Sequence, residues 1–133
     1  PIDLPEADLR QRIVETAMLY AGTHYRWGGK SPLGIDCSGL TSMAYLLNGI
    51  LIYRDARIVD DFPIHEISRE KMKPGDLLFF PGHIALYMGD GRYCHSTGRG
   101  GDDGFTINSL IPSATDYRSD LAEKITQVGS YFD

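Results

Sequence analysis

Cys37 stands where a cysteine side chain could act as a nucleophile. It is one of two cysteines in the chain and lies in GIDCSGLTSMAY, residues 34–45. Asp36 precedes it as a predicted N-cap. Apolar residues then follow at the spacing of one helix face: Leu40, Met43, Ala44 and Leu47. Unpaired amides and the dipole at a helix N-terminus lower the pKa of a thiol, and Gly39 would leave this helix end open to a substrate. The alternative is that Cys37 is a small buried core residue.

A cysteine nucleophile needs a base, and the base needs a group that orients it. Of the four histidines, His83 and His95 lie in neighbouring strand-like runs, HIALYM and RYCHST. The turn Gly89-Asp90-Gly91 between these runs predicts a hairpin. The other two histidines, His24 and His65, are interpreted as ordinary polar residues.

The length of the turn decides whether the two histidines meet. A two-residue loop would put them on opposite faces of the hairpin. A three-residue loop pairs Met88 with Arg92 and makes His83 and His95 diagonal neighbours on one face, the face of the site. Hydrophobicity favours the second register, because it gathers four apolar side chains on the other, core-facing side: Ile84, Leu86, Met88 and Cys94. Cys94 is therefore predicted to be structural.

A zinc site is the competing interpretation of these residues, because Cys37, His83 and His95 could supply three ligands. The chain contains neither a Cys-x-x-Cys nor a His-Glu-x-x-His element, and no fourth ligand is evident. We therefore expect no metal, and a nucleophile with a histidine base remains the favoured interpretation.

The elements that must position these residues can be outlined from apolar patterns. A helix is predicted from about Asp8 to a stop at Gly22, and a second helix follows Cys37. LLFF after the turn at residues 73–76 is a predicted buried strand, and FTINSL and EKITQVGSYF are two more. Residues 50–70 are predicted to be loop with a possible short helix. Helices followed by a mostly antiparallel sheet indicate an α+β domain with helices on one side of the sheet, residues 8–133, after a lead-in of residues 1–7.

Composition excludes several classes of protein. The 133 residues are enough for one domain with a real core, and 42% hydrophobic with 23% charged residues is typical of a globular chain. A net charge of −5 disfavours nucleic acid as a partner. No apolar run approaches the roughly 20 residues of a membrane span. The chain begins at Pro1 without a methionine, so we expect that its start has been removed.

Two long stretches, YRWGGKSPLGIDCSGLTSMAY and KPGDLLFFPGHIALYMGDGRYCHST, resemble the NlpC family of cell-wall cysteine peptidases. The resemblance runs from about Leu9 to Phe132. It implies a papain-like α+β fold, a catalytic domain over residues 8–133 and no cofactor. It also implies hydrolysis of peptidoglycan stem peptides, typically between D-γ-glutamate and a diamino acid.

The same resemblance implies a role for particular residues. Cys37 would be the nucleophile, His83 the general base and His95 the residue that orients His83. Four residues would line the oxyanion or substrate site: Tyr25, Trp27, Asp36 and Ser38. Asp55 resembles an acid that some relatives place against the free amino end of a short stem peptide. Its alternative role is that of a solvated loop acid paired with Arg54 or Arg57.

Alternatives from other classes remain open at this point. An amidase or acyltransferase acting on another amide or ester would use the same chemistry, and a non-catalytic wall-binding domain would keep only the fold. Many relatives carry an N-terminal SH3-like wall-binding module, which we expect to be missing from this chain. The resemblance implies a bacterial protein that is secreted or held in the cell envelope, or one that recycles wall fragments in the cytoplasm.

Overall fold

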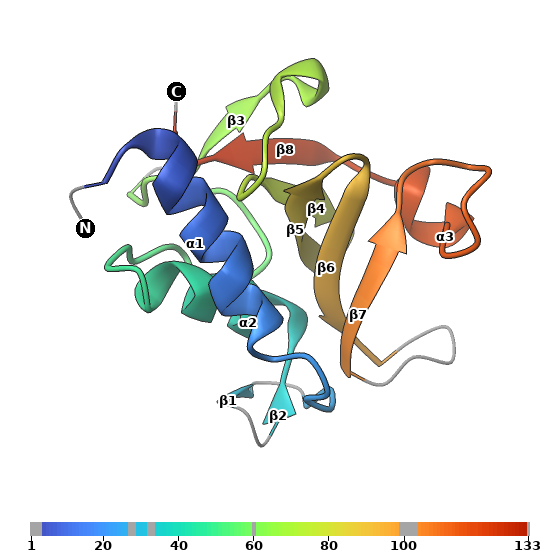
Figure 1. Cartoon of the computed structure of the whole chain (residues 1–133), viewed down its shortest axis with the longest axis horizontal. Helices are drawn as coiled ribbons and strands as arrows, with labels where there is room; N and C mark the ends of the chain where they lie inside the picture. Colours follow the sequence, from blue (N-terminus) through green and yellow to red (C-terminus); the bar gives the residue numbers. More distant parts are fainter. Residues whose placement is uncertain (1–3, 27–28, 32–33, 60, 99–103, 133) are drawn as a thin grey trace.

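Two helices from the first half of the chain cover one side of an antiparallel sheet in the computed structural model, which describes residues 4–26, 29–31, 34–59, 61–98 and 104–132 (Figure 1). The sheet has six strands in the order β3-β8-β4-β5-β6-β7. The helices are α1 (Glu6–Met18), α2 (Cys37–Leu46), α3 (Ser119–Ala122) and the 3-10 turn η1 (Arg69–Lys71). The sheet strands are β3 (His65–Ile67), β4 (Leu77–Phe80), β5 (His83–Gly89), β6 (Arg92–Thr97), β7 (Gly104–Ser109) and β8 (Gln127–Ser130); β1 (Lys30–Ser31) and β2 (Gly34–Ile35) form a separate hairpin. The predicted α+β class is confirmed.

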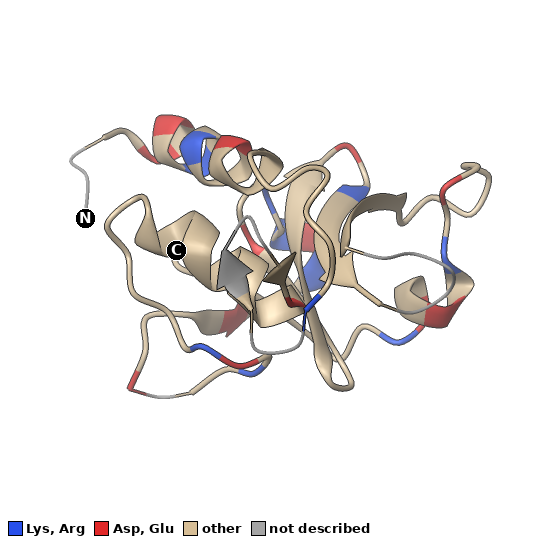
Figure 2. Ribbon diagram, turned by 90° about the horizontal axis from the view of Figure 1, so that it is seen from below, with Lys and Arg blue, Asp and Glu red and all other residues tan. Residues whose placement is uncertain are grey.

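The first helix begins earlier than the apolar spacing predicts, at Glu6 rather than Asp8. Pro5 precedes it, and the acidic side chains of its first turn suit the positive end of the helix dipole. The helix ends at Met18, before Gly22, because tight turns follow it. Acidic and basic residues both occur along this helix (Figure 2). No helix in the described ranges is both long and apolar enough to cross a membrane.

The core has one layer on each face of the sheet, because β4 is buried on both sides. Leu77 and Phe79 belong to the large cluster that includes buried residues of α1 and α2. Leu78 and Phe80 belong to a smaller cluster, against which Leu121 of α3 also packs. The sheet is therefore held from both sides, and α2 packs against the face formed by its central strands β5 and β6.

A buried ion pair joins α1 to the sheet. Nη1 of Arg10 lies 2.8 Å from Oδ1 of Asp76, and the hydroxyl of Ser130 donates to the same oxygen at 2.7 Å. The Arg10 guanidinium also lies over the ring of Phe132, 4.2 Å from its centroid. These contacts link the helix layer to the start of β4 and the end of β8.

The β5–β6 hairpin reaches the predicted register by a different route. Its turn is the two-residue loop Asp90-Gly91, with φ of 54° and 74°, and Gly89 pairs with Arg92. The predicted pairing of Met88 with Arg92 is therefore wrong. Met88 is an extra residue that forms a bulge, and on the side away from the turn Tyr87 pairs with Tyr93. The bulge restores the register that places both histidines on one face.

The segment before β4 contains structure that the sequence pattern did not indicate. β3 pairs with β8 at the edge of the sheet, where the prediction was a loop. This strand has only three residues and is largely exposed, so its sequence shows little of the apolar alternation that predicts a strand. The possible short helix of this segment corresponds to η1.

Candidate active site

Cys37 is the first residue of α2, as predicted. Asp36 is extended and caps the helix, because its Oδ1 accepts a hydrogen bond from the amide of Gly39 at 2.6 Å. The nucleophile candidate thus stands at the N-terminal end of a largely buried helix.

Gly39 serves the protein's own packing, which corrects the expectation that it leaves room for a substrate. A Cβ atom at this position would lie 2.2 Å from the carbonyl oxygen of Gly29 and 2.8 Å from Oδ1 of Asp36. The absence of a side chain thus allows the preceding loop to lie against the helix. The substrate must approach Cys37 from another direction.

The Cys37 thiol does not have the lowered pKa that its helix position predicts. Burial raises its pKa, and the nearby charge of Asp36 adds to this effect. Backbone hydrogen bonds from Ile84, Ser38 and Cys37 itself act in the opposite direction without overcoming burial. The side chain therefore favours the neutral thiol at neutral pH, and its reaction depends on a neighbouring base. Cys94 is fully buried, which raises its pKa to about 12, and this agrees with its predicted structural role.

His83 and His95 are joined as the register predicts. Nε2 of His83 lies 2.7 Å from Nδ1 of His95. The two side chains share one face, as expected, but differ in burial: His83 is half-buried and His95 is fully buried. His95 thus belongs to the protein interior, and its ring holds the half-buried ring of His83 through this contact.

Asn108 extends this pair into a chain of three side chains. Its Oδ1 lies 2.7 Å from Nε2 of His95, and its Nδ2 donates to the carbonyl of Asp116 at 2.8 Å. The cross-strand partner of His95 on β7 is Thr106, and Asn108 lies two residues farther along this strand. Asn108 and His95 therefore lie on the same face of the sheet. Asn108 was not among the predicted site residues. Its only signal is a polar residue in the strand-like run FTINSL, and that run does not reveal its register with β6.

The hydrogen bond to Asp116 fixes the protons along the chain. A carbonyl can only accept, so the Nδ2 of Asn108 faces Asp116 and its Oδ1 faces His95. Nε2 of His95 must then carry a proton and donate it, which leaves Nδ1 as the acceptor for Nε2–H of His83. When the His83 ring is neutral, its Nδ1 is therefore the nitrogen that can accept a proton.

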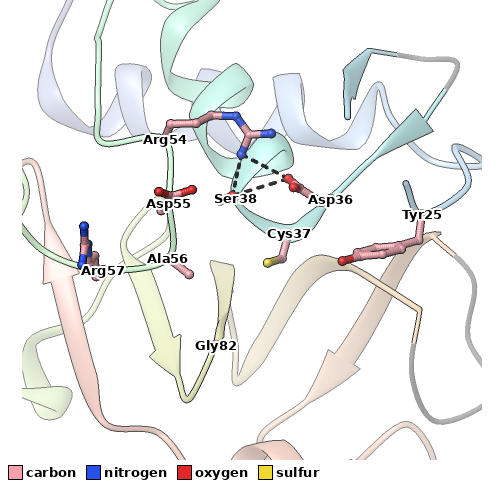
Figure 3. Close-up of a pocket in the computed structure, with 9 residues that line it drawn as sticks. All are labelled: Tyr25, Asp36, Cys37, Ser38, Arg54, Asp55, Ala56, Arg57 and Gly82. Carbon is pink, nitrogen blue, oxygen red and sulfur yellow. Dashed lines mark hydrogen bonds and ion pairs between the residues drawn. The ribbon is translucent and has the colours of Figure 1, made fainter. Parts of the chain in front are cut away.

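Cys37 and His83 line the same small cavity, of about 140 Å³. Its other lining residues are Tyr25, Gly82, Thr97 and Gly98. A larger cavity of about 620 Å³ shares Tyr25, Cys37 and Gly82 with it (Figure 3). The remaining residues of the larger cavity are Asp36, Ser38, Arg54, Asp55, Ala56 and Arg57. The nucleophile candidate thus stands where the two cavities meet.

The structure brings most of the predicted substrate residues to this larger cavity: Tyr25, Asp36, Ser38 and Asp55. Trp27 lies outside the described residues. His24 and His65 are exposed and line neither of the two cavities. The predicted groups therefore come from three separate segments that only the fold brings together.

Arg54 is a second residue of the site that the sequence pattern did not indicate. Its Nη1 donates to Oγ of Ser38 at 2.5 Å and lies 3.2 Å from Oδ1 of Asp36 (Figure 3). Arg57 instead donates to the hydroxyl of Tyr53 at 2.8 Å. Within the described part of the chain, neither arginine forms an ion pair with Asp55, whose exposed carboxylate borders the cavity.

The contacts of His95 disfavour the zinc interpretation. Both of its ring nitrogens are already engaged, one with His83 and one with Asn108. Binding a metal would require breaking one of these buried hydrogen bonds. The described residues also contain no cluster of three metal-ligating side chains.

Curated proteins similar to this chain include dipeptidyl-peptidase 6 of Lysinibacillus sphaericus, which is 58% identical over 127 residues. That alignment covers 96% of this chain and 46% of the relative. A γ-D-glutamyl-L-lysine dipeptidyl-peptidase of Bacillus cereus is 35% identical over 103 residues, covering 71% of this chain and 30% of that protein. The chain therefore spans less than half the length of these relatives.

Solved structures share the fold. An NlpC/P60 family protein from Bacillus cereus superposes with a TM-score of 0.74 at 29% identity, covering 99% of this chain and 42% of that one. The NlpC/p60 domain of the peptidoglycan hydrolase SagA gives a TM-score of 0.71 at 32% identity, covering 91% of this chain and 97% of that domain. The papain-like α+β fold expected from the sequence is confirmed. The NlpC/P60 family model matches residues 22–116, which include Cys37, both histidines and Asn108. By sequence and by fold, the chain belongs to the NlpC/P60 family.

Proposed function

We propose that this protein is a cysteine peptidase that hydrolyses peptidoglycan stem peptides at the bond between γ-D-glutamate and a diamino acid. One observation carries the proposal: Cys37, at a helix N-terminus, lines one cavity with a histidine whose hydrogen bonds leave Nδ1 as the base. Family membership and the names of the relatives support the choice of substrate.

The mechanism follows from these groups. Nδ1 of His83 takes the thiol proton of Cys37 as Sγ attacks the γ-glutamyl carbonyl carbon. The developing oxyanion accepts hydrogen bonds from the backbone amide of Cys37 and from the hydroxyl of Tyr25. His83 then protonates the leaving amine, and a thioester remains. Water, activated by the same nitrogen, hydrolyses the thioester and regenerates the thiol.

The raised pKa of Cys37 gives the base a defined task. A thiol that is neutral at rest must lose its proton during the attack, so His83 has to be neutral and correctly oriented. The bond to His95 supplies the orientation, because it holds the far nitrogen of the His83 ring. His95 and Asn108 are therefore positioning residues in this mechanism.

The larger cavity suits the acyl half of such a peptide. A γ-linked glutamate keeps a free α-carboxylate, and the Arg54 guanidinium is a cation at the cavity wall, held by Asp36 and Ser38. Asp55 lies farther along the same wall and could pair with the free amino end of L-Ala-γ-D-Glu (Figure 3). Recognition of that amine would release a dipeptide, which fits the names of the two relatives described above.

The test of this function is product analysis by mass spectrometry on the defined peptide L-Ala-γ-D-Glu-L-Lys. Wild type should release L-Ala-D-Glu. Cys37→Ser and His83→Ala should lose activity, the latter by about 10²–10⁴-fold. A Cys94→Ser variant serves as the control and should remain active. Activity that survives both site substitutions would exclude these roles, and binding without cleavage would favour a wall-binding domain.

Recognition of a free amine is tested separately, with Asp55→Asn. Wild type should cleave the free tripeptide roughly 10–100-fold better than its N-acetylated form, because a charge-assisted contact is lost on acetylation. The Asp55→Asn variant should lose most of this preference, while Asp61→Asn, an exposed acid that does not line the cavity, should keep it. Equal cleavage of both peptides by wild type would contradict the free-amine requirement and favour glycan-linked peptidoglycan.

A further inference from the structure

A third cavity, of about 170 Å³, lies beyond His83 and does not include Cys37 among its lining residues. It shares His83 and Thr97 with the small cavity that contains the nucleophile candidate. Its full lining is Phe80, Pro81, His83, Thr97, Arg118, Asp120, Leu121 and Lys124. These residues come from the end of β4, the two histidine strands and the segment around α3.

The three cavities follow one another along the site. The largest contains Asp55 and Cys37, the smallest contains Cys37 and His83, and the third contains His83 and Lys124. In the proposed reaction, His83 gives its proton to the leaving amine, so the leaving half must lie beside His83. The acyl half then occupies the Cys37 side, and the third cavity is the place for the diamino acid.

The charges of the third cavity favour an anion. Asp120 accepts two hydrogen bonds from Arg118, at 2.7 and 3.2 Å, so these two charges offset each other. Lys124 is exposed at the rim, and among the described residues its ammonium has no ion-pair partner. The lining therefore has one positive charge in excess, over the apolar side chains of Phe80 and Leu121. In the large cavity, by contrast, two arginines face two aspartates.

We propose that the third cavity binds the leaving half of the substrate through a carboxylate, with Lys124 as the residue that recognises it. This inference rests on the proposed function. A diamino acid at the end of a tripeptide has a free α-carboxylate close to the amine that is released. The lysine ammonium is a compact charge on a flexible stem, which suits a carboxylate at the rim of a small cavity. The site thus favours tripeptides over peptides that continue past the diamino acid.

The experiment compares two peptides, L-Ala-γ-D-Glu-L-Lys with a free C-terminal carboxylate and the same peptide as its C-terminal amide. Both carry the same side-chain amine, so the comparison isolates the carboxylate. Wild type should show a kcat/KM about 2–5-fold higher for the acid, the range of an exposed ion pair. Lys124→Met keeps the length of the stem and should lower kcat/KM for the acid only, so that the two peptides become equal.

Two further variants sharpen the result. Lys124→Glu should reverse the preference, because it places a negative charge at the rim. Lys71→Met removes an exposed lysine of η1 that lines none of the three cavities, and should leave the preference unchanged.

Equal cleavage of acid and amide by wild type, or a preference that survives Lys124→Met, would overturn the inference. Either result leaves cleavage itself intact and so leaves the proposed function in place. If wild type cleaves neither peptide, the proposed function fails and this subsite fails with it.

Discussion

Asn108 shows how, at the scale of single residues, a side chain can control a proton that it does not touch. Its amide is fixed by the carbonyl of Asp116, and this orientation passes through His95 to His83. Without the chain, a neutral His83 could carry its proton on either nitrogen, and one of the two tautomers cannot accept the proton of Cys37. The proposed mechanism therefore depends on a buried amide as well as on the nucleophile and base.

We expect Asn108→Ala to lower kcat by about 10–100-fold, because the tautomer of His83 is no longer fixed. Asn108→Asp keeps an acceptor for Nε2–H of His95 and should recover part of the loss. Nitrogen-15 NMR of the histidine rings should show a single His83 tautomer in wild type and a mixture in Asn108→Ala. A loss of kcat with an unchanged tautomer would mean that Asn108 acts only through stability. Ile107→Val, on the opposite face of the same strand, is the control for nonspecific disturbance of β7.

The sequence predicted Cys37, His83 and His95 because their chemistry is evident in their types and spacing. Asn108 and Arg54 could not be found in the same way. Asn108 enters the site through the register of β7 on β6, and Arg54 through a loop with no period. The shift in the pKa of Cys37 was also predicted in the wrong direction, because burial of a helix end cannot be seen in a local sequence pattern.

At the scale of elements, the bulge at Met88 decides whether the histidines meet. The turn Asp90-Gly91 alone would set a register in which His83 and His95 face opposite sides. One extra residue on β5 corrects this. The sequence predicted the strands and the shared face, since turn residues and apolar runs mark both. It could not distinguish a three-residue loop from a two-residue loop followed by a bulge, because the two give the same pairing beyond the turn.

Deletion of Met88 is expected to preserve the site. Tyr87 and Gly89 would then become neighbours in a regular ladder, and Tyr87 would keep its partner Tyr93. We expect kcat/KM to fall by less than about 10-fold, with stability lowered by about 1–2 kcal/mol because Met88 packs against the core. Activity assays and urea unfolding measure the two effects.

The matched control is deletion of Arg92, an exposed residue on the other side of the same turn. It shifts the whole of β6 against β5, so the histidine contact should be lost and activity abolished. Inactivity of both folded deletion variants would show that the bulge itself, and not only the register, is required.

At the scale of the whole molecule, buried ionisable groups set the response to alkali. Burial raises the pKa of Cys94 to about 12 and, with smaller effects from neighbouring charges, that of Tyr93 also to about 12. In the unfolded chain a thiol loses its proton at about pH 8.5 and a tyrosine at about pH 10. The folded state thus holds protons that the unfolded state has released, and stability must fall as pH rises above about 9.

We expect the free energy of unfolding to decline between about pH 9 and 12, with Cys94 contributing up to about 1.4 kcal/mol per pH unit. Cys94→Ala should lower stability at neutral pH through a small cavity, yet make the decline less steep. Urea unfolding at pH 7.5, 9 and 10.5 measures both quantities. Parallel curves for wild type and variant would show that Cys94 does not contribute to the alkaline loss.

The nucleophile candidate belongs to the helix layer, on α2, and the base to the sheet layer, on β5. Neither layer alone contains a reactive pair. A chain in which the helices and strands have formed but the layers have not yet docked is therefore inert, and it can cut nothing around it. The proposed hydrolase thus becomes active only when the two layers have docked. On heating, activity should be lost as the layers separate, at temperatures where much of the secondary structure still persists.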